Sequence, residues 1–219
     1  MKRLKIYLFR HGQTTFNRDG IFTGHKDPKL TRLGKNQARA VALKLRNKKF
    51  QVAIETHLSR SKDTLKEVLK FHPECKVVIT DDRMIERSYG ILEGKSHDEF
   101  IDKIGRQIYD LKVLGDAIEN LDSAKRRKIE RFFGEKEYDA IHRGYKVSVP
   151  RGESFADVEK RVKSFIKDLI KFMNGNNVSV AISAHGNSIR LFRKIMERAS
   201  VDEMSKWFIP YDKVFVYDV

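Results

Sequence analysis

The sequence predicts an α/β fold of three layers, in which a mostly parallel sheet is covered by helices. Short apolar runs alternate with longer segments whose apolar residues recur at helical spacing, and this alternation is typical of parallel strands joined by crossover helices. Two of the runs lead into a His-Gly pair, at His11 and His185. A chain of 219 residues can bury one sizeable core but hardly two. We therefore expect a single domain over residues 1–219.

The expected strands are short and apolar, and they cover residues 4–9, 52–55, 76–80, 178–182 and 213–217. The expected helices each begin at a hydroxyl residue, namely Thr31, Ser59 or Ser61, Ser154 and Ser188. Both His-Gly pairs follow the carboxyl end of an expected strand. Open α/β sheets bind their ligands at that edge, so we expect the functional site there.

Residues 97–149 interrupt the alternation, because much of this stretch is charged and helical in pattern and it offers no strand candidate. We interpret it as a helical insertion that packs over the edge of the sheet and roofs the pocket.

The chain is strongly basic, with a formal net charge of +15 and an isoelectric point near 9.8. Such a field attracts anions, which include phosphorylated metabolites and nucleic acid. The lysines are scattered along the whole chain, and the densest basic run, residues 125–128, has Glu119, Asp122 and Glu130 nearby. A solvated helix face explains this run better than a nucleic-acid patch.

The amino-terminal apolar run, residues 6–9, is too short for a signal peptide or a membrane span. One cysteine, Cys75, fits a reducing compartment and no Cys/His cluster has zinc spacing. We expect a cytoplasmic protein with no membrane partner. The sequence leaves homo-oligomerisation open.

Arginine directly precedes the first histidine, in the run Arg10-His11-Gly12. A phosphate dianion needs cationic, planar donors for its oxygens and a neutral imidazole nitrogen that can attack its phosphorus. Arg10 and His11 together supply both, which indicates phosphoryl-transfer chemistry.

Several motifs, in order along the chain, carry a resemblance to a known family. They are residues 10–14 with Asn17, 22–24 followed by 30–34, 58–61, 86–90 with 93–94, 152–154, and 184–190. Together they resemble the histidine phosphatase superfamily, and within it the cofactor-dependent phosphoglycerate mutases and their phosphatase relatives. The likeness covers nearly the whole chain and weakens between residues 97 and 149. It also implies that one edge strand runs antiparallel.

The resemblance implies a role for each catalytic residue. His11 would be the nucleophile, oriented through its other ring nitrogen by a backbone carbonyl. Arg10, Arg60 and His185 would hold the phosphoryl oxygens and stabilise their charge in the transition state. Glu86 would protonate the leaving oxygen and then take a proton from the acceptor. No metal is implied, because these cations supply the positive charge.

The resemblance also implies a set of phosphate- and substrate-binding residues, which are Asn17, Thr23, Gly24, Arg87, Tyr89, Lys95, Arg143 and Asn187. Some have simpler roles, since Asn17 and Thr23 could serve only to shape a turn and Arg87 could hold its loop. The other histidines lack a comparable context and are interpreted as surface or structural residues: His25, His57, His72 and His142. His97 is a borderline case.

Two activities share the first half-reaction and differ in the acceptor of the phosphoryl group. A phosphoglycerate mutase would interconvert 3- and 2-phosphoglycerate and need 2,3-bisphosphoglycerate to prime His11, whereas a phosphatase would transfer the group from small phosphate esters to water. Residues 86–90, Asn187 and the carboxyl-terminal residues 209–218 favour the mutase, while residues 152–154 are common to both branches. We favour the mutase, with the phosphomonoesterase as the alternative.

Two features count against the mutase. Family mutases grip the substrate carboxylate with adjacent arginines, but the best-placed segment here, His142-Arg143-Gly144-Tyr145, offers only Arg143. A mutase lysine is also not cleanly matched, because Lys95 is close and His97 falls nearer the expected spacing.

A third hypothesis is a nucleic-acid-binding or regulatory module without catalysis. The intact set His11, Arg10, Arg60, Glu86 and His185 argues against it. The expected partner is a small phosphorylated metabolite rather than nucleic acid, and no metal or prosthetic group is expected as a bound cofactor.

Overall fold

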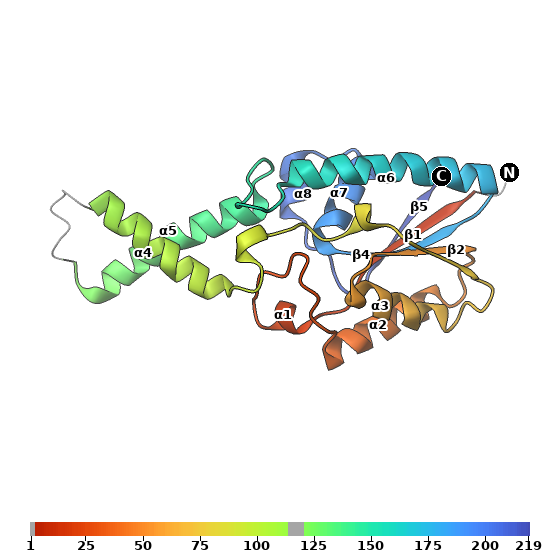
Figure 1. Cartoon of the computed structure of the whole chain (residues 1–219), viewed down its shortest axis with the longest axis horizontal. Coiled ribbons are helices and arrows are strands. Elements are labelled where there is room, and N and C mark those ends of the chain that lie inside the picture. The colour runs from red at the N-terminus through yellow and green to blue at the C-terminus, as the bar shows by residue number, and fades with distance from the viewer. Residues whose placement is uncertain (1–2, 114–120) are drawn as a thin grey trace.

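A five-stranded sheet forms the centre of the computed structural model, which describes residues 3–113 and 121–219 (Figure 1). Its strands are β1 (Lys5–Arg10), β2 (Val52–Glu55), β3 (Val77–Thr80), β4 (Val180–Ala184) and β5 (Val214–Asp218). They lie in the order β3-β2-β4-β1-β5. The pairs β3–β2, β2–β4 and β4–β1 are parallel, and the edge strand β5 runs antiparallel to β1. The expected mostly parallel sheet and its antiparallel edge are both confirmed.

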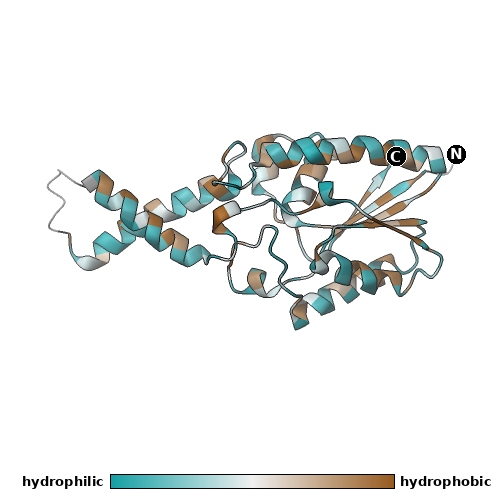
Figure 2. Cartoon of the chain, viewed as in Figure 1, coloured by the Kyte–Doolittle hydropathy of each residue, from teal (hydrophilic) through white to brown (hydrophobic). Residues whose placement is uncertain are grey.

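Helices cover both faces of this sheet, which confirms the three layers. On one face lie α2 (Arg32–Leu45) and α3 (Ser59–Leu69), and on the other lie α6 (Phe155–Asn176) and α7 (Gly186–Glu197). The short helix α1 (Thr15–Arg18) lies at the carboxyl edge of the sheet, and the short helix α8 (Val201–Lys206) packs against α7. Figure 2 shows the apolar residues on the strands and on the inner sides of the helices.

The predicted capping residues of α2 and α6 are correct. Thr31 accepts a hydrogen bond from Gly34 N at the start of α2, and Ser154 accepts one from Asp157 N in a capping box at the start of α6. The predicted start of α3 at Ser59 is also correct, although no side chain caps this helix. The Ser61 hydroxyl instead donates to Ser183 O in the core and ties α3 to β4.

Two boundaries near the carboxyl edge differ from the sequence prediction. Strand β4 begins at Val180 rather than at residue 178, and α7 begins at Gly186 rather than at Ser188. The strand is shifted because its register is set by pairing with β1, where Ile6 lies opposite Val180. The short helices α1 and α8, and the 3-10 turns Asp82–Met84 and Gly90–Leu92, were not predicted.

The insertion is a pair of crossed helices, α4 (His97–Val113) and α5 (Ser123–Arg143), that extends from the body as an arm (Figure 1). Two glycines allow the helices to cross closely, because a Cβ atom at Gly105 would lie 2.1 Å from Glu130 O and one at Gly134 would lie 2.0 Å from Ile101 O. The expectation that the insertion roofs the pocket is correct only for the base of the arm. Its outer part points away from the sheet.

The basic run of residues 125–128 lies on α5 and is exposed. Lys125 pairs with Asp122, and Arg126 pairs with Glu130 and with Asp110 of α4. These contacts fit the interpretation of a solvated helix face. Over the described residues, no helix is long and apolar enough to cross a membrane.

Candidate active site

The two His-Gly pairs meet because their strands are neighbours. Arg10 at the end of β1 lies opposite Ala184 at the end of β4, so His11 and His185 leave the sheet side by side. The His11 N–H donates to Ala184 O at 3.1 Å, and the two imidazole centroids lie 5.0 Å apart. Both histidines are almost wholly buried. The register of one strand pair therefore builds the centre of the site.

His11 has the environment of a neutral nucleophile. Its Nδ1 lies 2.7 Å from Gly12 O, and Arg60 Nε donates to its Nε2 at 3.3 Å. Because a carbonyl only accepts and a guanidinium only donates, the ring proton sits on Nδ1 and the lone pair on Nε2. Burial, and then the charges of Arg60 and Arg10, hold the pKa of His11 well below its usual range. The backbone carbonyl expected from the resemblance is thus Gly12 O.

Arg60 is fully buried beneath the site. Its two terminal nitrogens donate to Lys26 O at 2.6 Å and Gly24 O at 2.8 Å, and burial lowers its pKa to about 10. It therefore stays charged at neutral pH. The loop that carries these carbonyls needs glycine, because Gly24 has φ +48° and a Cβ there would lie 2.1 Å from Glu93 Oε1.

Arg10 occupies the other side of His11. Its NH1 donates to Ile209 O at 2.9 Å, and its guanidinium lies 4.0 Å from the centroid of the Tyr211 ring. The Gly186 backbone packs directly against this guanidinium, since a Cβ there would lie 3.4 Å from Cζ of Arg10. Arg10 Nε is buried and has no hydrogen-bond partner among the described residues.

His185 presents a similarly unpartnered atom. Its Nε2 lies 2.8 Å from Thr56 Oγ1, while its buried Nδ1 has no partner within residues 3–113 and 121–219. Burial, and then the charge of Arg60, holds the pKa of His185 well below its usual range. If the Thr56 hydroxyl donates to Nε2, Nδ1 carries the proton and can donate to a phosphate oxygen.

Glu86 lies across the site from His11, in the segment after β3. Its Oε1 accepts from Arg87 N at 2.8 Å and from Asn187 N at 3.1 Å. Arg161 of α6 holds the backbone, since it donates to Glu86 O at 3.1 Å and pairs with Glu153. The carboxylate is therefore fixed by backbone amides on one oxygen while it lines the pocket.

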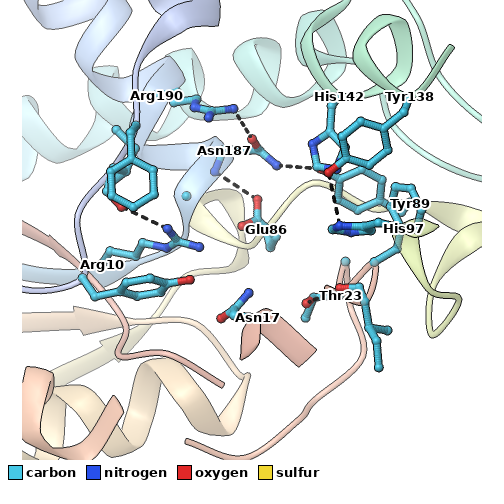
Figure 3. Close-up of a pocket in the computed structure, with 17 residues that line it drawn as sticks. Arg10, Asn17, Thr23, Glu86, Tyr89, His97, Tyr138, His142, Asn187 and Arg190 are labelled. Atoms are coloured by element: carbon cyan, nitrogen blue, oxygen red, sulfur yellow. Dashed lines mark hydrogen bonds between the residues drawn. The ribbon is translucent and has the colours of Figure 1, made fainter. Parts of the chain in front are cut away.

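The pocket above these residues is a cavity of about 330 Å³ (Figure 3). It is lined by charged and polar groups at one end and by rings at the other: Arg10, Asn17, Ile21, Phe22, Thr23, Gly24, Glu86, Tyr89, His97, Tyr138, His142, Gly186, Asn187, Arg190, Phe208, Ile209 and Tyr211. We call Arg10, His11, Arg60, Glu86 and His185 the phosphate floor. We call Phe22, Tyr89, His97, Tyr138 and His142 the aromatic wall.

The structure brings most of the predicted binding residues to this cavity. Asn17, Thr23, Gly24, Tyr89 and Asn187 all line it. Asn17 also shapes its loop, because its Oδ1 accepts from the backbone and hydroxyl of Thr14. With Oδ1 used in this way, the amide nitrogen of Asn17 is the atom left to donate to a ligand.

Three predicted binding residues do not line the cavity. Lys95 is exposed on the far side of the arm base, in a separate groove. Arg143 is half-exposed, pairs with Asp139 and donates to Ser205 O at 3.0 Å. Arg87 is buried, but it donates to Ile141 O at 2.7 Å and stacks on the Tyr89 ring. It joins the loop to the end of the arm.

Residues outside the predicted site set also line the cavity. His142, interpreted as a surface or structural residue, lines the cavity, and so do His97, Tyr138, Arg190 and Tyr211. Of these residues, only His97 and His142 could have been found from the sequence, because they fall near the positions where family mutases carry cations. The interpretation of the remaining histidines as surface or structural holds, with His72 packed on Phe50 in the core.

Within the described residues, no group of three or more His, Cys, Asp or Glu side chains is arranged to hold a metal ion. The cationic groups of the floor, Arg10 and Arg60, are the ones available to hold an anion.

Comparisons with known proteins agree with this geometry. Residues 6–114 and 117–219 match the model of the histidine phosphatase superfamily (branch 1). A 2,3-bisphosphoglycerate-dependent phosphoglycerate mutase from Borrelia garinii subsp. bavariensis is 30% identical, over 98% of this chain and 86% of the relative.

Solved structures of both branches share the fold. A putative α-ribazole-5'-P phosphatase from Escherichia coli superposes with a TM-score of 0.70 at 20% identity, over 97% of this chain and 89% of that one. A phosphoglycerate mutase from Bacillus anthracis gives a TM-score of 0.69 at 19% identity, over 99% and 88%. Fold similarity alone therefore does not separate mutase from phosphatase.

Proposed function

Because the chain belongs to the histidine phosphatase superfamily (branch 1), whose members are mutases or phosphatases, we propose that it is a phosphomonoesterase acting through a phosphohistidine on His11. The substrate is a small phosphate ester, and water is the final acceptor of the phosphoryl group. The chemistry resides in the phosphate floor, and the choice of acceptor depends on the residues above it.

The first step transfers the phosphoryl group from the ester to His11. The Nε2 lone pair attacks phosphorus while Nδ1–H stays bonded to Gly12 O, 2.7 Å away. Arg60 Nε, which donates to His11 Nε2 at 3.3 Å, turns its donor to a phosphoryl oxygen. Arg10 and the unpartnered Nδ1 of His185 bind the other oxygens and stabilise their charge.

Glu86 moves the protons in both steps. It protonates the leaving alkoxide as the P–O bond breaks, and the resulting carboxylate takes a proton from the water that attacks the phosphohistidine. Backbone amides of Arg87 and Asn187 fix one carboxylate oxygen, so the carboxylate keeps its place between the two half-reactions. Free phosphate then leaves, and Glu86 is protonated again.

One observation favours water over phosphoglycerate as the acceptor. The aromatic wall carries His97 and His142 near the positions where a mutase would need cations, and Lys95 and Arg143 lie outside the cavity. Burial lowers the pKa of His97, and burial followed by the charges of its neighbours lowers the pKa of His142 to about 2. The wall is therefore neutral and offers little to a second anionic group.

The mutase stays as a second candidate because the curated relatives are named as mutases at 26–30% identity over 91–98% of this chain. Arg190 and Asn187 also line the cavity and supply polar donors near Glu86. As a mutase, the protein would need 2,3-bisphosphoglycerate to phosphorylate His11 before the first turnover.

One incubation separates the two candidates. The protein is given 3-phosphoglycerate with and without 2,3-bisphosphoglycerate, and 2-phosphoglycerate and free phosphate are measured. We expect phosphate release with no isomerisation. Formation of 2-phosphoglycerate that depends on 2,3-bisphosphoglycerate would replace the phosphatase proposal by the mutase.

The phosphohistidine itself is tested by labelling with a ³²P-ester. The label should be acid-labile and alkali-stable, and it should be absent from the His11→Ala variant but present in His57→Ala, a matched change at an exposed histidine. Label that persists in His11→Ala would mean that the nucleophile lies elsewhere.

A further inference from the structure

We propose that His142 selects the substrate, by donating its Nε2–H to a neutral acceptor on a ring in the alcohol portion of the ester. The substrate class is then the phosphate monoester of an uncharged alcohol that carries a flat ring with a hydrogen-bond acceptor. This inference rests on the proposed function, because it describes the leaving group of the same reaction.

A chain of hydrogen bonds determines which nitrogen of His142 carries the proton. It starts at Arg190, whose NH1 donates to Asn187 Oδ1 at 3.1 Å and whose Nε donates to Trp207 O at 2.9 Å. A guanidinium has no acceptor, so the oxygen of the Asn187 amide must face Arg190. The amide nitrogen then faces Tyr89, whose hydroxyl oxygen lies 3.4 Å away.

The chain continues from Tyr89 to His142. Since Asn187 Nδ2 donates to the Tyr89 oxygen, the hydroxyl proton is directed to His142 Nδ1, at 3.3 Å. His142 Nδ1 is then an acceptor, and in a neutral imidazole the proton must sit on Nε2. Figure 3 shows this sequence of contacts along the upper side of the cavity.

The Nε2 atom of His142 is buried and has no hydrogen-bond partner among the described residues, although the side chain lines the cavity. A buried donor without a partner is costly. An acceptor supplied by the substrate removes that cost, whereas a substrate without one leaves the donor unpaired. Discrimination by such a donor is stronger than discrimination by apolar contact alone.

A neutral acceptor suits His142, because its neutral ring brings no charge of its own to compensate the lost hydration of an anion. Burial and the charges of Arg87, Arg190 and Arg143 disfavour its protonation. Arg190 also lines the cavity. Its NH1 and Nε atoms already donate hydrogen bonds to Asn187 Oδ1 and Trp207 O.

The shape of the wall favours a ring. Phe22 lies at its centre, with ring centroids of the other four members between 4.3 and 5.9 Å away: Tyr89, His97, Tyr138 and His142. Phe208 and Tyr211 face the same cavity from the carboxyl-terminal segment. Rings pack best on other rings, in offset or edge-to-face contacts.

A pair of esters that differ in one ring atom tests the proposal. Benzyl phosphate has no ring acceptor, while 3-pyridylmethyl phosphate has a ring nitrogen and is otherwise of the same shape. At mildly alkaline pH, where the pyridine is unprotonated, kcat/KM of the wild-type protein should favour the pyridyl ester by about tenfold. In His142→Phe, which keeps a ring, the ratio should fall to about one.

Lys95→Gln is the matched control, because Lys95 neighbours the arm base but lies outside the cavity, and it should keep the wild-type ratio. A wild-type ratio of one, or an unchanged ratio in His142→Phe, would overturn the inference. The same would follow if 3-phosphoglycerate were a better substrate than either ester. Each of these results would leave the proposed function intact as long as the esters still transferred a labelled phosphoryl group to His11. If no ester labelled His11, the proposed function itself would be contradicted.

Discussion

The phosphate floor and the aromatic wall border the same cavity but are built in different ways. The floor lies at the ends of two paired strands, on α3 and, for Glu86, in the segment after β3. Its members His11, Arg60 and His185 are almost fully buried. The wall is assembled from loops and from the base of an arm whose outer part extends away from the body (Figure 1). Floor residues make short contacts to backbone carbonyls and amides, whereas wall residues contact mainly one another.

This difference separates two tasks. A reacting phosphoryl group requires donors held within a fraction of an ångström, and only a sheet edge with a fixed register supplies this. Selection of the ester by its alcohol portion requires only a surface of suitable shape and polarity. An insertion can change such a surface without disturbing the floor. We therefore expect changes in the floor to remove the reaction and changes in the wall to redirect it.

The largest expected effect is at His11. His11→Ala should lower ester turnover by more than about 10⁴-fold, because no other described side chain in the floor is placed to form the covalent intermediate. Phosphate release under saturating ester measures this. If His11→Ala kept a tenth of the wild-type rate, the floor would not be the site of chemistry.

The body and the arm should also differ in what they contribute to stability. Phe165 on α6 is 2% exposed within the main core, and Phe165→Ala should reduce the free energy of unfolding by about 3–5 kcal/mol. Phe132 on the arm is 51% exposed, and Phe132→Ala should change it by less than about 0.5 kcal/mol. Urea denaturation of both variants checks this pair. Equal losses would show that the arm shares the core of the body.

The sequence was sufficient to predict the sheet of the body and the helices that cover its two faces. Hydrophobic periodicity located every strand of the sheet, and strong caps at Thr31 and Ser154 located two helices. The floor followed because each of its residues stands in a short motif next to a strand or helix end. Arg10, His11 and His185, for example, stand within a few residues of the carboxyl end of a predicted strand, so the sequence already places them at the edge of the sheet.

The wall could not be predicted because its members come from separate segments. His97 and His142 lie 45 positions apart and meet only because α4 and α5 cross at Gly105 and Gly134. Lys95 and Arg143 looked better by residue type, since they are cations. Each lies near a wall residue in sequence, but on a helix or turn such a neighbour points in another direction, and both side chains lie outside the cavity.

Arg60→Gln should have an intermediate effect, with a loss of about 10²–10³-fold in labelling of His11, because one donor to the phosphoryl oxygens is removed. Its pH dependence gives a second test. The charge of Arg60 lowers the pKa of His11, so the variant should have a raised His11 pKa. Labelling requires neutral His11 and is lost as pH falls through that pKa. The acid limb should therefore move to higher pH.

The measurement is the labelling rate as a function of pH, with circular dichroism to verify that Arg60→Gln is folded. An acid limb that stays in place or moves to lower pH would show that Arg60 does not set the protonation of His11.

The smallest effect is expected from giving the wall the charges of a mutase. The double variant His97→Lys/His142→Arg places two cations in the cavity, and it should raise kcat/KM for 3-phosphoglycerate relative to benzyl phosphate by about tenfold. A charge-assisted contact to the carboxylate is worth more than the neutral one it replaces, but two buried cations repel each other and lose hydration, so the gain is modest. Lys95→Ala removes a cation two residues from His97 and outside the cavity, and should leave the ratio unchanged. If Lys95→Ala lowered the ratio and the double variant did not raise it, the cavity wall would not be what distinguishes the two kinds of ester.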